Sequence, residues 1–323
     1  MGNKVLVTGG AGYVGSAVVR HLIAKGYEVF AIDNLIQGSE GALSFLGYPT
    51  FHFIKGDITD VRQMEKLIKK VDYVVHLAAI VGEGACKREP ELTKKTNIDG
   101  SKMLIDICSK NKIKKLVFFS TCSSYGVQDI NIMANEETTL NPVSLYAESK
   151  ISMEKYLIEN YDPDLSYTIL RPSTVHGLST RMRFDLIVNH FCKDAYLNNK
   201  LEIFGGDLWR PLMWVGEVGR IVDTIFTAEL KLIKNQIFNL GNTNANMQKK
   251  EIAEIIKKEF LPNISIEYSG MDQDLRSYKV DFSKIEKTLN FKLEKPINLA
   301  IDEILFSLKN NFFKDPNSKI YKN

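Results

Sequence analysis

Val5-Leu-Val-Thr-Gly-Gly-Ala-Gly-Tyr-Val-Gly15 is the stretch of this sequence that predicts the fold. Its first four residues are apolar or favour β-structure, which is typical of a buried parallel strand. Gly9, Gly12 and Gly15 then follow at intervals of three, and an apolar pattern with helical spacing begins at Tyr13. A strand, a glycine-rich turn and a helix N-terminus together form an anion site. Backbone N–H groups and the helix dipole face the ligand there, and glycine lets the chain approach a pyrophosphate closely.

A second predicted strand, Glu28–Asp33, ends in an acid about twenty residues after this turn, the spacing of a ribose contact. We therefore predict dinucleotide binding rather than a merely structural turn. A carboxylate at this position accepts hydrogen bonds from the adenosine ribose hydroxyls but would repel a 2′-phosphate. Asn34 and Leu35 follow Asp33, with no arginine or lysine nearby in the sequence to receive a phosphate. The predicted cofactor is accordingly NAD rather than NADP.

The composition narrows the class of protein. The chain has 323 residues, of which 44% are hydrophobic and 25% charged, as expected for one large or two modest globular domains. A net charge of +3 is too small to indicate binding to nucleic acid or to a membrane. No apolar run approaches the length of a membrane-spanning helix, and the first predicted strand begins almost at Met1, which leaves no room for a signal peptide. We therefore expect a cytoplasmic location.

The cysteines give no sign of a metal site. Cys86, Cys108, Cys122 and Cys192 lie far apart, without metal-binding spacing. We expect reduced intracellular thiols and no bound metal.

Two later strand ends extend the predicted cofactor site. Residues 50–54 alternate like a strand and run into Gly56-Asp57-Ile58, a polar residue and an apolar one suited to hold an adenine edge. Asp57 could instead cap a helix over residues 61–70, and both roles could hold together. The buried run 71–77 ends in small residues that let the backbone pass close to a cofactor. The predicted cofactor contacts are Gly9, Gly12, Tyr13, Val14, Gly15, Asp33, Asn34, Asp57, Ile58, Leu77, Ala78, Ala79, Asn97 and Lys150.

His76, inside the run 71–77, has a different interpretation. It is expected to be a hydrogen-bonded core histidine and not a ligand.

A second cluster of polar residues suggests a catalytic site. The predicted strand Lys115–Ser120 opens into Thr121-Cys-Ser-Ser-Tyr-Gly126, and open α/β sheets place their ligands at the carboxyl ends of strands. Tyr146 and Lys150 follow four residues apart in a predicted helix and so share one face. A phenol titrates near ~10, but a neighbouring ammonium and a positively charged nicotinamide would lower its pKa. By spacing alone the pair could be a surface tyrosine beside a solvated lysine, but the dinucleotide turn favours catalysis.

These motifs resemble those of the extended short-chain dehydrogenases/reductases that act on nucleotide sugars, in particular enzymes of the UDP-glucose 4-epimerase type. The resemblance covers nearly the whole chain. It includes the Gly-rich turn, Tyr146-Ala-Glu-Ser-Lys150 as the Tyr-x-x-x-Lys pair, and Arg210-Pro-Leu-Met-Trp-Val215 as the segment with a diphosphate-binding arginine. It implies that Tyr146 is the acid/base, that Lys150 binds the nicotinamide ribose, and that Thr121 hydrogen-bonds the reacting hydroxyl. It also suggests a homodimer formed through helices at about 91–111 and 146–161.

Departures from the family pattern narrow the expected reaction. The 4,6-dehydratases of this family carry Asp-Glu after the catalytic threonine, whereas Cys122-Ser123 stands here. Neither residue supplies that carboxylic-acid chemistry, so dehydration is not expected. Trp214 replaces the usual histidine, and Pro211-Leu212 replaces Asp-Phe, in the segment that begins at Arg210.

The second half of the chain is expected to bind the substrate. We predict an α/β protein with a Rossmann-type doubly wound parallel sheet over residues 1–172, to which segments near 213–241 return. Residues 173–323 mainly form a smaller substrate-binding α/β cap. Guanidinium groups pair bidentately with diphosphate, so the arginines of the cap are candidates for the nucleotide diphosphate. The predicted substrate contacts are Thr121, Ser123, Arg181, Arg183, Asn189, Arg210 and Arg276.

The resemblance implies oxidation at C4 of a nucleotide diphosphate sugar through a 4-keto intermediate. If the keto sugar turns over and takes the hydride back on its other face, the result is 4-epimerisation, the outcome that the family favours. If the keto sugar leaves, the protein is a net 4-dehydrogenase that needs a second oxidant. A non-catalytic NAD-binding regulatory protein is a third interpretation, which the presence of Thr121, Tyr146 and Lys150 disfavours.

Overall fold

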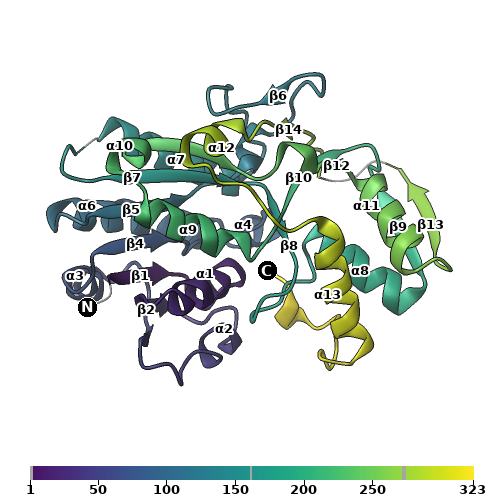
Figure 1. The fold of residues 1–323 in the computed structure, drawn as a ribbon, viewed down its shortest axis with the longest axis horizontal. Coiled ribbons are helices and arrows are strands. Elements are labelled where there is room, and N and C mark those ends of the chain that lie inside the picture. The colour runs from purple at the N-terminus through teal and green to yellow at the C-terminus, as the bar shows by residue number, and fades with distance from the viewer. Residues whose placement is uncertain (1–2, 161, 271–273) are drawn as a thin grey trace.

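A computed structural model describes residues 3–160, 162–270 and 274–323. At its centre lies a seven-stranded parallel sheet in the order β11-β7-β5-β4-β1-β2-β3 (Figure 1). The strand order reverses between β1 and β4, which is where doubly wound sheets bind their ligands. The strands are β1 (Lys4–Thr8), β2 (Glu28–Asp33), β3 (Phe51–Lys55), β4 (Tyr73–His76), β5 (Lys115–Phe119), β7 (Tyr167–Pro172) and β11 (Gln236–Leu240).

Helices cover both faces of the sheet. Helices α1 (Tyr13–Ala24) and α9 (Glu217–Thr227) bury Val18, Leu22 and Ile221 in one core. On the opposite face, α3 (Val61–Ile68), α6 (Ser101–Lys110) and α7 (Leu145–Glu159) bury Leu104 and Met153 in a second core. The predicted Rossmann-type fold is confirmed.

Strand β11 returns to the sheet from the second half of the chain. It pairs in parallel with β7, so that Gln236 lies opposite Thr168 and Leu240 opposite Pro172. Helix α9, which precedes it, packs against α1. The boundary at residue 172 stays a prediction.

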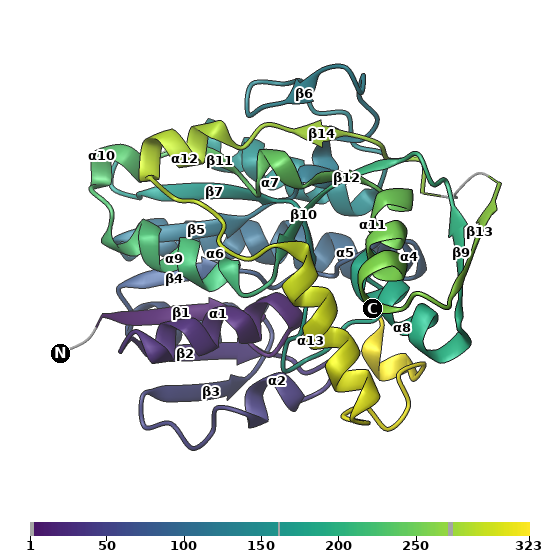
Figure 2. The ribbon, with the colours of Figure 1, turned by 45° about the vertical axis from the view of Figure 1, so that its right-hand side comes forward.

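A smaller α/β layer lies beyond the carboxyl ends of the strands (Figure 2). It has its own core, which includes Phe184, Leu212 and Ile304. Its strands pair as β12-β10-β8 and β13-β9. Its elements are β8 (Thr174–His176), α8 (Ile187–Asn198), β9 (Lys200–Phe204), β10 (Trp209–Trp214), β12 (Asn246–Gln248), α11 (Lys249–Ile255), the π-helix η4 (Ile256–Phe260), β13 (Ser265–Ser269) and α13 (Ile297–Lys309).

Two predicted helices differ in detail. The long helix expected at about 91–111 is divided into α5 (Pro90–Lys94), the π-helix η1 (Lys95–Gly100) and α6. Asp60, and not Asp57, is the N-cap of α3, where its carboxylate accepts a hydrogen bond of 3.0 Å from Gln63 N. The remaining elements are α2 (Glu40–Leu43), α4 (Glu83–Arg88), η2 (Cys122–Tyr125), β6 (Met133–Ala134), α10 (Leu230–Ile233), η3 (Thr243–Ala245), β14 (Lys279–Val280), α12 (Ser283–Leu289) and η5 (Lys319–Tyr321).

Within the described residues, no helix has the length and apolar character that crossing a membrane requires. The four cysteines are buried free thiols, as predicted.

Candidate active site

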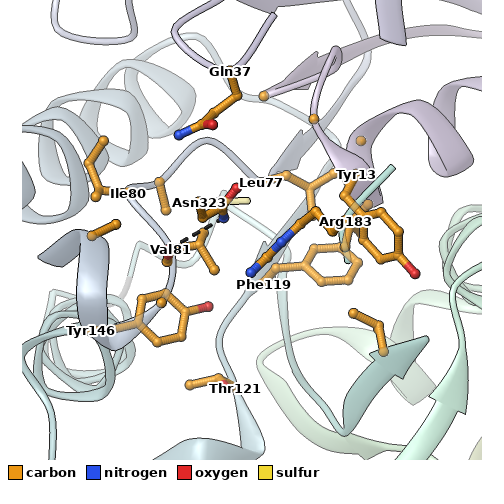
Figure 3. A pocket seen from close by; sticks show the side chains of 18 of the residues that line it. Tyr13, Gln37, Leu77, Ile80, Val81, Phe119, Thr121, Tyr146, Arg183 and Asn323 are labelled. Carbon is orange, nitrogen blue, oxygen red and sulfur yellow. Dashed lines mark hydrogen bonds between the residues drawn. The ribbon is translucent and has the colours of Figure 1, made fainter. Parts of the chain in front are cut away.

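The carboxyl ends of the central strands and the cap enclose a cleft of about 580 Å³. All but two of the residues predicted to contact cofactor or substrate line this cleft; Asn97 and Asn189 do not. In Figure 3, Tyr146 and Thr121 lie on one side of the cleft, Tyr13 lies on the other, and Arg183 points into the space between them.

The glycine turn follows β1 and requires glycine at positions 9 and 15. Gly9 has a φ of +71°, and a Cβ there would lie 2.8 Å from Ala78 N. A Cβ at Gly15 would collide with the Gly9 carbonyl oxygen, so α1 can start this close to the turn only with glycine at position 15. The turn therefore presents bare backbone to the cleft at a helix N-terminus, as a pyrophosphate requires.

Two carboxylates, those of Asp33 and Asp57, line the cleft at the carboxyl ends of β2 and β3. The Asp33 carboxylate accepts hydrogen bonds from Ala11 N at 3.1 Å and Leu35 N at 2.9 Å, while burial raises its pKa. Burial opposes ionisation of Asp57 as well, but hydrogen bonds from Thr59 and Asn34 lower the pKa of Asp57 overall. Asp57 thus lines the cleft as a charged acceptor.

His76 is a core histidine, as predicted. Its Nδ1 lies 2.8 Å from Thr8 Oγ1 and its Nε2 lies 2.9 Å from Ser101 Oγ. Burial lowers its pKa to about 3, so the ring is neutral. The bonds join β1, β4 and α6 behind the cleft.

Asn97 also lies behind the cleft wall, in η1, and is 1% exposed. Its Oδ1 accepts a hydrogen bond from Ile80 N at 2.8 Å, and its Nδ2 donates to Ile80 O at 2.9 Å. The predicted cofactor contact of Asn97 stays a prediction; in the structure its amide holds the Ile80 backbone, which itself lines the cleft.

Thr121, Tyr146 and Lys150 reach the cleft from two neighbouring elements. Thr121 follows β5 and caps η2 by accepting a hydrogen bond of 3.1 Å from Ser123 N. Ser144 caps α7 through Ala147 N, which starts the helix just before Tyr146. Lys150, one turn later and 3% exposed, has its Nζ 5.0 Å from the centre of the Phe118 ring.

Burial dominates the electrostatics of Tyr146 and Lys150. Burial raises the pKa of Tyr146 to about 12, and the cations that oppose the rise are Arg183 and Arg276 rather than Lys150. Burial lowers the pKa of Lys150 to about 8. Loss of hydration is thus the largest influence on both groups. A further positive charge in the cleft would lower the pKa of the phenol.

Two arginines from distant segments, Arg210 and Arg276, meet at the cleft wall. Arg210 Nη2 lies 3.0 Å from Asp274 Oδ2, and Arg276 binds the same carboxylate through Nε at 2.7 Å and Nη2 at 2.6 Å. Burial would raise the pKa of Asp274, but the two guanidinium groups hold it well below its usual range. Arg276 Nη1 also donates to Ser123 Oγ at 2.9 Å. The structure thus gathers three of the residues predicted to contact the substrate, namely Ser123, Arg210 and Arg276.

Asn189, Arg181 and Arg183 form hydrogen bonds that hold the loop between β8 and α8 in the cap. Asn189 is fully buried, accepts a hydrogen bond of 2.9 Å from Gly177 N and donates to Arg183 O at 2.8 Å. Its predicted contact with a pyrophosphate stays a prediction; in the structure both ends of its amide are bonded to the loop. Arg183 is paired with Asp185 at 2.9 and 2.7 Å, and Arg181 is bonded to Gln37 at 2.8 Å.

Several residues that line the cleft were not predicted from the sequence. Asp274, two positions before Arg276, could have been found as its acidic partner. Ser120 and Ser173 could have been found from their positions at strand ends; their hydroxyls are buried without a partner among the described residues. Gln37, Glu83 and Asn323 carry no local signal. Within the parts of the chain that the structure describes, no group of histidine, cysteine or acidic side chains could hold a metal ion.

Comparisons with known proteins agree with this geometry. A profile of the NAD dependent epimerase/dehydratase family matches residues 5–241. UDP-glucose 4-epimerase of Lactobacillus helveticus is 30% identical over 325 residues, covering 94% of each chain. Among solved structures, UDP-glucose 4-epimerase of Thermotoga maritima has a TM-score of 0.85 at 28% identity, covering 96% of this chain and 100% of its own. UDP-N-acetylglucosamine 4-epimerase of Methanobrevibacter ruminantium has a TM-score of 0.86 at 27% identity, covering 96% and 99%.

Proposed function

We propose, because this chain belongs to the NAD dependent epimerase/dehydratase family, that it is a nucleotide-sugar 4-epimerase that works through a 4-keto intermediate. The observation that carries the proposal is that Thr121, Tyr146 and Lys150 line the same cleft as the glycine turn and the Arg210–Arg276 pair. A single cavity thus offers a dinucleotide site, an acid/base and a diphosphate site.

The residues of the cleft suit NAD. The glycine turn would hold the pyrophosphate and Asp33 the adenosine ribose, while Asp57 and Ile58 would hold the adenine edge. The buried hydroxyls of Ser120 and Ser173, which line the cleft after β5 and β7, offer hydrogen bonds to the part of the ligand that lies beyond the adenosine. When bound, NAD supplies a hydride acceptor and the positive charge of its nicotinamide ring.

The chain's own residues account for the proton transfer. As the phenolate, Tyr146 Oη takes the proton from the C4 hydroxyl and so becomes the neutral phenol, which later returns the proton to the C4 oxygen; Thr121 Oγ1 orients that hydroxyl. Lys150 holds the ribose beside the tyrosine. Arg210 and Arg276 bind the diphosphate, and this remote binding energy aligns the reacting carbon.

The positions after Thr121 disfavour dehydration. Cys122 is buried, its Sγ lies 3.0 Å from Arg171 O, and burial raises its pKa far above the ordinary value for a thiol. Ser123 is bonded to Arg276. Neither side chain can exchange a proton with a sugar at C5 or C6 near neutral pH, so the keto sugar is expected to keep its hydroxyl.

We extend the proposal to assembly and location. The protein is expected to be a cytoplasmic homodimer, formed through α5, η1, α6 and α7. The helical range used for this prediction ends at Tyr161, which lies outside the described residues. Light scattering after gel filtration would distinguish monomer from dimer.

The activity test mixes the purified protein, without added cofactor, with UDP-, GDP- and dTDP-sugars. NADH absorbance is followed and the sugar products are identified by NMR. An isomeric sugar with a brief or absent NADH signal is the expected result. A persistent NADH signal with a 4-keto product would identify a net dehydrogenase instead.

The Tyr146→Phe variant tests the acid/base role. It is expected to lose turnover by about a hundredfold to ten-thousandfold while still binding NADH, because only the hydroxyl is removed. Unchanged turnover of a proven substrate would refute the role of Tyr146. If neither wild type nor variant turns over any sugar but both bind NAD, the non-catalytic interpretation would hold.

A further inference from the structure

Arg181 lies between the cofactor end of the cleft and the C-terminal residues of the described chain. It is 3% exposed and lines the cleft together with Gln37, Val81 and Asn323. We propose that Arg181 is a positioning residue that ties these segments into a strap over the cofactor, and that opening of this strap controls how fast the dinucleotide enters and leaves. The strap is defined as Gln37, Val81, Arg181, Lys322 and Asn323.

Each of the three guanidinium nitrogens of Arg181 donates at least one hydrogen bond. Nη2 donates to Gln37 Oε1 at 2.8 Å and to Lys322 O at 3.0 Å. Nη1 donates to Asn323 Oδ1 at 2.8 Å, and Nε donates to Gln37 O at 3.4 Å. One side chain therefore joins three segments that are far apart in the sequence, and a planar fork of donors suits such a junction.

Asn323 continues the strap to the opposite wall. Its Nδ2 donates to Val81 O at 3.3 Å, a bond that is visible in Figure 3, and its backbone N donates to Asp185 at 3.3 Å. Val81 follows the small residues at the end of β4, and Gln37 follows Asp33 at the end of β2. The strap thus spans the two strand ends between which a dinucleotide would lie.

The strap is fixed to the cap by aromatic contacts. The Tyr321 ring lies 5.6 Å from the Phe184 ring and 5.4 Å from the Phe313 ring, both at steep angles, and Phe184 N donates to Tyr321 O at 2.9 Å. Edge-to-face pairs of this kind are stabilising, so residues 321–323 are held in place from outside the cleft.

These contacts revise the role of Arg181. It was expected to bind the substrate diphosphate, but its donors are occupied by the protein, and Gln37 belongs to the loop after the predicted ribose-binding strand. A diphosphate could use this guanidinium only after the strap had opened. Opening of the strap breaks the bonds of Arg181 to Gln37 and so releases the loop that follows Asp33. Opening therefore also changes the predicted ribose site.

The test measures NADH exchange and not turnover. Wild type and the Arg181→Ala variant are loaded with NADH and mixed with excess NAD, and the decay of NADH fluorescence gives the dissociation rate constant. Fluorescence gain on mixing with NADH gives the association rate constant. Gln37→Ala and Asn323→Ala each remove one arm of the strap without touching Arg181. Arg62→Ala, which removes an exposed arginine from α3, is the matched control.

We expect Arg181→Ala to raise both rate constants by about tenfold to hundredfold. That is the effect of one or two charge-assisted bonds at about a factor of ten each, since water takes over the remaining partners in the variant. Arg181→Lys should resemble Arg181→Ala, because one ammonium cannot hold Gln37 and Asn323 together. Gln37→Ala and Asn323→Ala should show smaller increases, and Arg62→Ala none. If Arg181→Ala does not fold, the rate constants of Gln37→Ala and Asn323→Ala test the strap instead.

Two results would overturn the strap. One is an unchanged dissociation rate constant in the variants. The other is faster dissociation with unchanged association, which would mean that Arg181 binds the dinucleotide directly. The strap rests on the cofactor site of the proposed function, and the two can fail separately. A protein that binds no NADH contradicts the cofactor site, whereas one that binds NADH but ignores the substitutions contradicts only the strap.

Discussion

Replacing Lys150 by methionine is expected to stabilise the fold while removing a residue of the active site. The Lys150 side chain is 3% exposed and its ammonium faces an aromatic ring, with no ion pair to a carboxylate among the described residues. Burial lowers its pKa from 10.5 to about 8, although nearby negative charge opposes the shift, and at 1.36 kcal/mol per pH unit this corresponds to a net cost of about 3 kcal/mol for the charged ammonium. Methionine has a similar unbranched shape and carries no charge.

The cation–π contact with Phe118 reduces the expected gain. Such a contact is worth about 1 kcal/mol, so Lys150→Met should be about 2 kcal/mol more stable than wild type at pH 7. The sign of the pH dependence follows from the depressed pKa. Below pH 8 lysine is charged in both states and the penalty is complete. Between pH 8 and 10.5 the unfolded chain holds the proton more tightly than the folded one, so wild-type stability rises and the advantage of the variant fades.

Urea unfolding followed by circular dichroism, at pH 7 and pH 10 and without cofactor, measures the difference; cofactor is omitted because binding would stabilise wild type. Lys155→Met, an exposed lysine on the same helix, is the control and should change little at either pH. The reasoning is refuted if Lys150→Met is no more stable than wild type at pH 7, or if its gain is the same at pH 10.

Three further changes test the packing around the site. Gly15→Ala should abolish NADH binding in a fluorescence titration, because its Cβ would collide with the Gly9 carbonyl; a folded variant with normal affinity would contradict this. Glu154→Gln should lower the unfolding free energy by about 3 kcal/mol by leaving the Arg171 guanidinium buried without its carboxylate, and a double-mutant cycle with Arg171→Met should recover part of the loss in urea unfolding. Arg276→Met should weaken UDP binding by about tenfold in calorimetry, and an unchanged affinity would remove it from the diphosphate site.

Much of the cofactor site was predictable because its signals are local. A strand end, a glycine turn and a carboxylate at a set distance belong to one βαβ unit, and parallel strands bring their carboxyl ends to one edge of the sheet. Asp33 and Asp57 could therefore be assigned to the same cleft from their positions at strand ends. Tyr146 needed the glycine turn and the family resemblance as well, and the cavity contains all three.

The asparagines show where local signals stop. Asn97 and Asn189 are polar residues near predicted ligand segments, but an amide binds whichever backbone groups the packing leaves without a partner. The structure gives them Ile80, Gly177 and Arg183 as partners, and none of these pairings is marked in the sequence.

The sequence by itself determined the fold and the cofactor class, because both depend on side chains at fixed short spacings along strands and helices; the catalytic roles that it suggests for Thr121, Tyr146 and Lys150 stay predictions. Only the tertiary structure decided the state and use of these groups. Burial sets the pKa values of Tyr146 and Lys150, and burial depends on everything that packs around them. The contact of Arg181 with Gln37 joins residues 144 positions apart, and such a pairing follows from chain topology and not from any local pattern.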